Sequence, residues 1–230
     1  MSKTRITLII SIISILLLLY LFNFKSNIHL LFKSDKELFN YSIANQEKIY
    51  ASSEVIVRKI NIRRKHANLI HRLFNKLSRP VLYFIEFKNN QNSFNVSYHN
   101  NGSTANSNVS EDIIFSINSS FYNHKFQPNG SIIINGKELG IPSKSSGHYK
   151  VIDGVAKAGP TSIFNASEKV KFSCQSHPSI MKDGIIWEYI MDQSKNKDYW
   201  NNKTYRSIVG HKDNGNICFI TSGNGGLLSI

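Results

Sequence analysis

The pattern of apolar residues begins with a nearly uninterrupted run from Ile6 to Phe24. An α-helix rises about 1.5 Å per residue, so a run of this length can cross a bilayer core of roughly 30 Å. The pattern therefore predicts a transmembrane helix. A cleavable secretory signal is the alternative, because Lys3 and Arg5 precede the run. The run is longer than a typical signal core, however, and no small-residue cleavage site follows it closely.

From residue 80 onward the pattern changes to short apolar stretches separated by Gly, Pro, Asn or Asp. Such stretches are typical of β-strands, and Asn135-Gly136, Asp153-Gly154 and Asn214-Gly215 favour tight turns between them. Gly159-Pro160 is expected to interrupt the sheet. The predicted strands are Pro80 to Phe87, Phe94 to Tyr98, Ile113 to Ile117, Ser131 to Asn135, Tyr149 to Ile152, Val170 to Ser173, Gly184 to Tyr189, Tyr205 to Val209 and Asn216 to Thr221.

Together these elements predict an α+β fold, a largely antiparallel central sheet with few helices, preceded by one N-terminal transmembrane helix. Residues 1–24 are the expected anchor, 25–79 a linker with a basic helix, and 80–230 the folded domain. A chain of 230 residues is long enough for one such domain with a substantial core. The polar stretch Asn100 to Ser110 is predicted to be a long loop.

The formal net charge of +13 is concentrated in one segment. Arg58 to Arg79 carries eight Lys or Arg residues and no acid, and apolar residues at helical spacing predict an amphipathic helix over Arg63 to Ser78. Three interpretations stay open: a surface helix packed on the domain, a helix attracted to anionic lipid headgroups, and a nucleic-acid-binding segment. We expect no nucleic-acid partner, because a basic helix without a recognised motif does not support one.

Cys174 and Cys218 are the only cysteines. A disulfide and two buried free thiols both agree with the sequence. The spacing of His and Cys residues does not resemble a zinc site, so we predict no structural metal and no cofactor.

Candidate chemistry lies in three segments of the second half of the chain. The first contains Asn118-Ser119-Ser120-Phe121-Tyr122, then a turn at Pro128-Asn129-Gly130. The second begins Gln175-Ser176-His177-Pro178 and ends at Gly184. The third contains Arg206, Ser207, Gly210 and His211.

In this order and spacing the three segments resemble the phosphodiester glycosidase family. That family has an Asn-Gly-Gly-Phe-Phe-like turn followed by Pro-x-Gly, a Gln-x-Gly-Pro block, and an Arg-(Ser/Thr)-x-x-Gly-(His) block. The resemblance covers Phe115 to Ile230 well and 81–114 only loosely. The chain departs from the pattern at His177, Ser119 and Ser120, where the family has Gly.

The resemblance implies cleavage of the bond between an amino sugar and a phosphate. Arg206 is the expected phosphate clamp, since its planar fork suits phosphate oxygens. Asn118, Ser207 and His211 complete the expected catalytic group, with hydroxyl, amide and imidazole groups that donate hydrogen bonds or transfer a proton. The expected substrate-binding residues are Ser119, Phe121, Gly130, His177, Pro178 and Gly210.

Each of these residues also has a structural interpretation that stays open. Arg206 can pair with an acid on a neighbouring strand, Asn118 can cap a turn, and His211 can be a solvated turn residue. The family pattern continues into a Leu-Asp-Gly-Gly-Gly-Ser segment, whereas this chain ends at Ile230, so an expected acidic residue is missing. Asp213, Asp183 and Glu188 are weak substitutes.

Two hypotheses of function follow. The first is a membrane-anchored phosphodiester glycosidase-like protein that hydrolyses a phosphate-linked amino sugar, of the N-acetylglucosamine type, in an envelope polysaccharide. The second is a truncated, catalytically inactive relative that acts as a glycan- or membrane-binding module. The expected partners are the lipid bilayer and a phosphorylated glycan. Because the family acts on secreted or lumenal glycans, we expect the folded domain outside the cytoplasm on a single-pass anchor.

Overall fold

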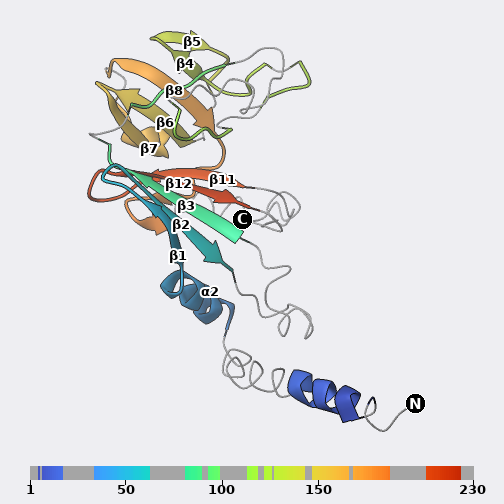
Figure 1. Cartoon of the computed structure of the whole chain (residues 1–230). Coiled ribbons are helices and arrows are strands. Elements are labelled where there is room, and N and C mark those ends of the chain that lie inside the picture. Colours follow the sequence, from blue (N-terminus) through green and yellow to red (C-terminus); the bar gives the residue numbers. More distant parts are fainter. Residues whose placement is uncertain are drawn as a thin grey trace. The chain divides into compact units, whose positions relative to one another are not determined.

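The computed structural model describes residues 5, 7–17, 34–62, 81–89, 93–98, 113–118, 122–125, 127–142, 147–165, 168–186 and 206–223 (Figure 1). The chain divides into two compact units. The smaller unit comprises Met1–Glu47, Lys59–Leu82 and Gly223–Gly226, and the larger comprises Lys48–Arg58, Tyr83–Ser222 and Leu227–Ile230.

Most of the strands belong to two five-stranded sheets. The first sheet has the order β1-β2-β3-β12-β11, and the second has the order β5-β4-β8-β6-β7. The strands of the first sheet are β1 (Glu47–Ala51), β2 (Val55–Asn61), β3 (Val81–Phe87), β11 (Ser207–His211) and β12 (Ile217–Ser222). Those of the second sheet are β4 (Ile132–Ile134), β5 (Lys137–Leu139), β6 (Gly147–Ile152), β7 (Val155–Pro160) and β8 (Val170–Ser176). A separate hairpin pairs β9 (Met181–Lys182) with β10 (Ile185–Ile186), and a 3-10 turn, η3 (Thr161–Ile163), follows β7.

Tight turns connect several antiparallel neighbours. Asn135 and Asp153 have positive φ angles of 50° and 51°, and the glycine after each is also at positive φ. Positive φ at both central residues is the type I′ geometry that matches the twist of a hairpin. The predicted turns between β4 and β5 and between β6 and β7 are therefore confirmed. Asp183-Gly184, between β9 and β10, has the same geometry.

The core of the larger unit combines side chains from both sheets. Phe219 of β12 is central: its ring centroid lies 5.1 Å from Phe115, 5.9 Å from Phe87 and 6.3 Å from Tyr149 of β6. Neighbours along a strand face opposite sides of the sheet, so every second residue of β3, β6, β8 and β12 contributes to this core. The fully buried Ile217 lies beside Phe219 on the same face of β12.

In the smaller unit, α2 (Asp35–Ala44) begins with a capping box. The Ser34 hydroxyl accepts the Glu37 N–H at 3.3 Å, and the Glu37 carboxylate accepts the Ser34 N–H at 2.7 Å. These bonds satisfy N–H groups that a helix start leaves unpaired. The sequence interpretation gave 25–79 to a linker with a basic helix, but α2, β1 and β2 all lie in that range. Residues 63–78 and the Asn100 to Ser110 stretch lie outside the described residues.

The predicted fold class is wrong in two respects. The structure has two stacked sheets with a shared core in place of one central sheet of an α+β domain. The predicted transmembrane helix is also overturned, because no helix among the described residues has the length and apolar content needed to cross a membrane.

Three strand predictions need smaller corrections. Residues 93–98 and 113–118 have irregular backbone, although Phe94, Tyr98, Phe115 and Ile117 pack against the core. Their alternation therefore reflects burial and not strand pairing. Gly159-Pro160 does not interrupt the sheet, since β7 continues through Pro160. β7 is an edge strand, where a residue without an N–H group is tolerated.

The close approach of Gly140 to the backbone gives a testable prediction. Gly140 has φ of 80°, and a Cβ there would collide with the carbonyl oxygen of Gly130. Gly136 has nearly the same φ, 78°, but open space around it. We expect Gly140→Ala to cost more than about 3 kcal/mol of unfolding free energy, against about 1 kcal/mol for Gly136→Ala. Urea denaturation measures both values, and equal losses would contradict the packing described.

Candidate functional site

Gln175 of β8 connects the first two motif segments. Its side chain is buried, and its Oε1 atom accepts the Ser131 N–H at 3.0 Å, while its own N–H donates to the Ser131 carbonyl at 2.8 Å. A Cβ on Gly130 would lie 3.3 Å from both Cβ and Oε1 of Gln175. Glycine at position 130 therefore leaves the room that this amide needs, and the Pro128-Asn129-Gly130 turn packs directly on the second segment.

The sequence interpretation did not include Gln175 among the site residues, although it lies in the second motif. A long polar residue beside the buried Cys174 is the signal that could have indicated it. A buried amide is costly unless it is hydrogen-bonded, so such a residue usually has a fixed partner. The neighbouring Ser131 hydroxyl donates to Glu138 Oε1 at 2.5 Å, which extends the polar contacts to β5.

The remaining residues of these two segments lie around this contact point or outside the described residues. Asn118 is exposed and directly follows Phe115 and Ile117, which pack on the core. Ser119 and Phe121 lie outside the described residues. His177 and Pro178 are half-buried, joined by a cis peptide bond, and lead out of β8 toward the buried Ser179.

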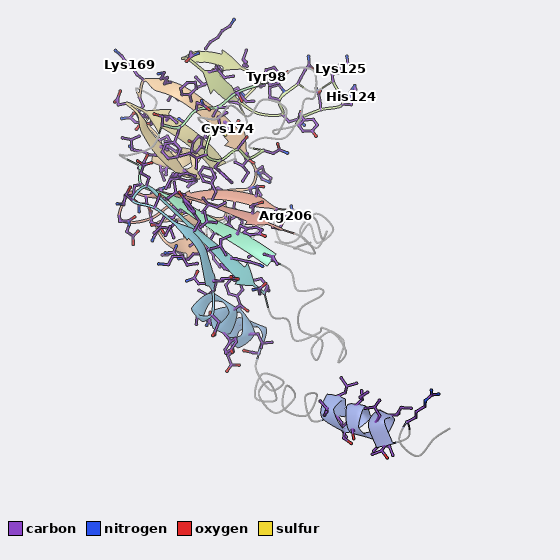
Figure 2. All side chains as sticks on the ribbon, viewed as in Figure 1. Tyr98, His124, Lys125, Lys169, Cys174 and Arg206 are labelled. Atoms are coloured by element: carbon purple, nitrogen blue, oxygen red, sulfur yellow. The ribbon has the colours of Figure 1, made fainter. Side chains whose placement is uncertain are left out.

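The third segment forms β11, an edge strand of the first sheet. Arg206 continues its ladder: the Arg206 N–H donates to Ser222 Oγ at 2.7 Å, and the Ser222 N–H donates to the Arg206 carbonyl at 2.9 Å. Figure 2 shows Arg206 at this start of β11. The Ser222 hydroxyl also donates to the Arg206 carbonyl at 3.4 Å, so the backbone of the half-buried Arg206 is held by three hydrogen bonds.

The two faces of β11 separate the predicted catalytic residues. Val209 packs on the core, so Ser207 and His211 share its face, and Arg206 and Gly210 lie on the opposite face. Ser207 and His211 are four strand steps apart, or about 13 Å along the strand. The strand therefore does not gather Arg206, Ser207 and His211 around one point. Their catalytic roles stay predictions.

His211 connects the two sheets. Its Nδ1 atom lies 2.6 Å from the Ala158 carbonyl oxygen of β7. A carbonyl only accepts hydrogen bonds, so Nδ1 is the donor in this contact. His211 is therefore fixed by a structural hydrogen bond.

Glu86 of β3 is a carboxylate of the first sheet that accepts three side-chain hydrogen bonds. It is buried on the face of β3 opposite Ile85 and Phe87, and accepts hydrogen bonds from Arg58 at 3.3 Å, Lys212 at 3.0 Å and Asn216 at 2.8 Å. Burial alone would raise the pKa of Glu86, but the bonds from Asn216 and Lys212, and then the Lys212 charge and Arg58, outweigh it and hold this pKa below its ordinary value.

Cys174 and Cys218 are not joined in a disulfide. Cys174 of β8 is buried in the core, directly opposite Tyr149 of β6. Cys218 of β12, in the other sheet, pairs with Gly210 of β11 and faces away from the core. Burial, with a smaller contribution from the Glu86 charge, raises the pKa of the Cys218 thiol. Of the two interpretations that the sequence allowed, the structure does not show the disulfide, and Cys174 is buried while Cys218 is half-buried.

Two of the acids that the sequence analysis offered as substitutes for the family's Asp lie in turns. Asp183 and Asp213 are both exposed, in the β9–β10 and β11–β12 turns, and Glu188 lies outside the described residues. In the part of the chain that the structure describes, no group of three or more His, Cys, Asp or Glu residues could hold a metal ion.

The lowered pKa of Glu86 predicts a specific loss of stability in acid. The folded protein keeps Glu86 ionised at lower pH than the unfolded chain does, so its contribution is full above the ordinary value of 4.5 and is lost as pH falls through the folded pKa. We expect Glu86→Gln to lower the unfolding free energy at pH 7 by about 3 kcal/mol and to flatten its dependence on pH below that value. Urea denaturation from pH 7 to pH 3 tests this, with Glu47→Gln on exposed β1 as the control. An unchanged acid slope in Glu86→Gln would refute the assignment.

No protein-family model and no curated protein matches the chain.

Proposed function

We propose that the chain is a hydrolase of the phosphodiester glycosidase type, which releases an amino sugar of the N-acetylglucosamine class from a phosphate diester in an envelope polysaccharide. The observation that supports the proposal is the hydrogen bond from the Ser131 N–H to Gln175 Oε1. It joins two motif segments that are 44 residues apart. Contact between distant motif segments is expected where both contribute to one ligand site.

The chemistry of this reaction requires binding of charge more than proton transfer. The leaving group is a phosphate ester, a weak base, so protonation contributes less than in ordinary glycoside hydrolysis. Donors fixed in advance around the phosphate contribute more. Arg206 suits this role, because the hydrogen bonds between its backbone and Ser222 fix the strand that carries its guanidinium.

His211 is less suited to act on the same phosphate as Arg206. It lies on the opposite face of β11 and at the other end of the strand. Its Nδ1 proton is already donated to Ala158. We therefore assign phosphate binding to Arg206. We assign His211 no proton transfer to that phosphate.

A second function, glycan binding without hydrolysis, is supported by a separate observation. The described acids that could support a sugar cation, Asp183 and Asp213, lie in exposed turns. A retaining or inverting hydrolysis normally uses two carboxyl groups that flank the scissile bond. A chain that keeps the phosphate clamp and lacks this pair would bind the diester and release no sugar.

The assay for the first function is release of free sugar from an N-acetylglucosamine phosphodiester by the full-length chain. Arg206→Lys keeps the charge but loses the planar fork, so we expect kcat/KM to fall at least about tenfold, and Arg206→Ala about 100-fold or more. Arg58→Lys is the matched control, because Arg58 pairs with Glu86 and should leave the rate unchanged.

Calorimetric titration with the same diester separates the two functions. Binding without sugar release by the folded chain would support the second function. A folded chain that neither binds the diester nor releases sugar would remove both.

A further inference from the structure

The outer face of the second sheet carries a cluster of polar side chains. Tyr149 and Cys174 are directly opposite each other and face the core, so the adjacent pairs His148 with Gln175 and Lys150 with Ser173 face the other way. This face is the one directed away from the core shared with the first sheet. We call the group formed by His148, Lys150, Ser173, Glu168 and Phe164 the outer-face cluster.

Several polar atoms of this cluster are buried without a hydrogen-bond partner among the described residues. They are both ring nitrogens of His148, the hydroxyl of Ser173 and one carboxylate oxygen of Glu168. Ser173 is 1% exposed. Native proteins pair nearly all buried polar atoms, because an unpaired one loses its hydration without compensation. Three unpaired groups on neighbouring segments therefore need an explanation.

An aromatic ring covers the cluster. The Phe164 ring centroid lies 6.0 Å from the His148 ring, and the Lys150 ammonium lies 4.5 Å from the same centroid. The preceding residue, Ile163, fills the space over Gly159 of β7, where a Cβ would collide with it. The segment that follows β7 is thus held on the sheet by Ile163 and contacts the polar groups through Phe164.

The charges of the cluster nearly balance. Burial depresses the pKa of His148 to about 4, assisted by the Lys150 charge, so the ring is neutral near pH 7, with one donor and one acceptor nitrogen. Lys150 is influenced by the carboxylates of Glu168 and Glu138, which oppose the lowering of its pKa by burial. The cluster therefore offers donors and acceptors together, without a large excess of positive charge.

We propose that the outer-face cluster is a subsite for one neutral, hydroxyl-rich sugar residue. Sugar hydroxyls both donate and accept, so they match the Glu168 oxygen as an acceptor, Ser173 and Lys150 as donors, and His148 as either. The apolar face of a sugar ring stacks on an aromatic ring such as Phe164. A phosphate group matches less well, because Glu168 and Glu138 would repel it. The subsite lies on the second sheet, whereas Arg206 lies on the first, so the inference does not depend on hydrolysis.

Titration of the full-length chain with N-acetylglucosamine, glucose and, separately, inorganic phosphate tests the subsite. The readout is the imidazole NMR signal of His148. We expect each sugar to shift this signal in a saturable manner and phosphate to leave it unchanged. If neither sugar shifts the signal, the proposal is overturned, because the cluster then binds no sugar. Saturation by phosphate would overturn it in favour of an anion site.

Ser173→Ala separates a binding role from a structural one. Removing an unpaired buried hydroxyl should raise the melting temperature of the free protein, whereas loss of a ligand donor should weaken sugar binding about fivefold. Phe164→Leu keeps an apolar cover without an aromatic ring and should weaken binding about tenfold. Ser42→Ala is the control: its buried hydroxyl donates to the Leu38 carbonyl at 2.8 Å, so the variant should lower the melting temperature and leave sugar binding unchanged.

A rise in melting temperature for Ser173→Ala with unchanged sugar affinity would also overturn the proposal. Arg206→Ala distinguishes the subsite from the proposed hydrolysis. This variant should lose sugar release from the phosphodiester and keep the His148 shift with the free monosaccharide. Loss of that shift in Arg206→Ala would contradict a subsite independent of Arg206.

Discussion

Burial of aromatic and branched side chains between the two sheets is the constraint on which the larger unit depends. Phe219 contacts Phe87 and Phe115 as well as Tyr149 of the other sheet, so one ring connects both layers. Because strands alternate their faces, this burial also decides which residues point outward. Glu86, Cys218 and Arg206 lie on outward faces of the first sheet, and His148 and Lys150 lie on the outward face of the second.

Buried polar groups on the two outward faces differ in how far they are hydrogen-bonded. Around Glu86, two cations and an amide supply hydrogen bonds, and the carboxylate is satisfied within the protein. Around His148, four buried atoms have no partner among the described residues. A satisfied network adds stability and specificity, whereas an unsatisfied one costs stability and is expected where a ligand supplies the missing bonds. We therefore interpret the group around Glu86 as structural and the outer-face cluster as a binding site.

The proposed chemistry depends on residues that lie at separate places in the fold. Gln175 and Gly130 are in direct contact, which brings two motif segments together, while Arg206 and His211 are on opposite faces of one edge strand. Phosphate binding by Arg206 is compatible with this arrangement, and a shared catalytic group of Arg206, Ser207 and His211 is not favoured by it. The hypothesis of hydrolysis and that of glycan binding therefore differ mainly in whether a carboxylate completes the site.

The sequence by itself determined the local features of this protein. The Asn135-Gly136 and Asp153-Gly154 turns and the hairpin of β11 and β12 follow from residues that adopt positive φ and from short apolar stretches, which are properties of a few neighbouring residues. Only the tertiary structure decided that residues 93–98 and 113–118 pack without forming strands, that β1 and β2 join the first sheet, and that Gln175 holds Ser131. It also placed the buried polar atoms of Ser173 and His148 where no hydrogen-bond partner among the described residues reaches them. These outcomes depend on contacts between segments far apart in the chain, and an apolar or polar pattern records whether a side chain is buried but not which partner buries it.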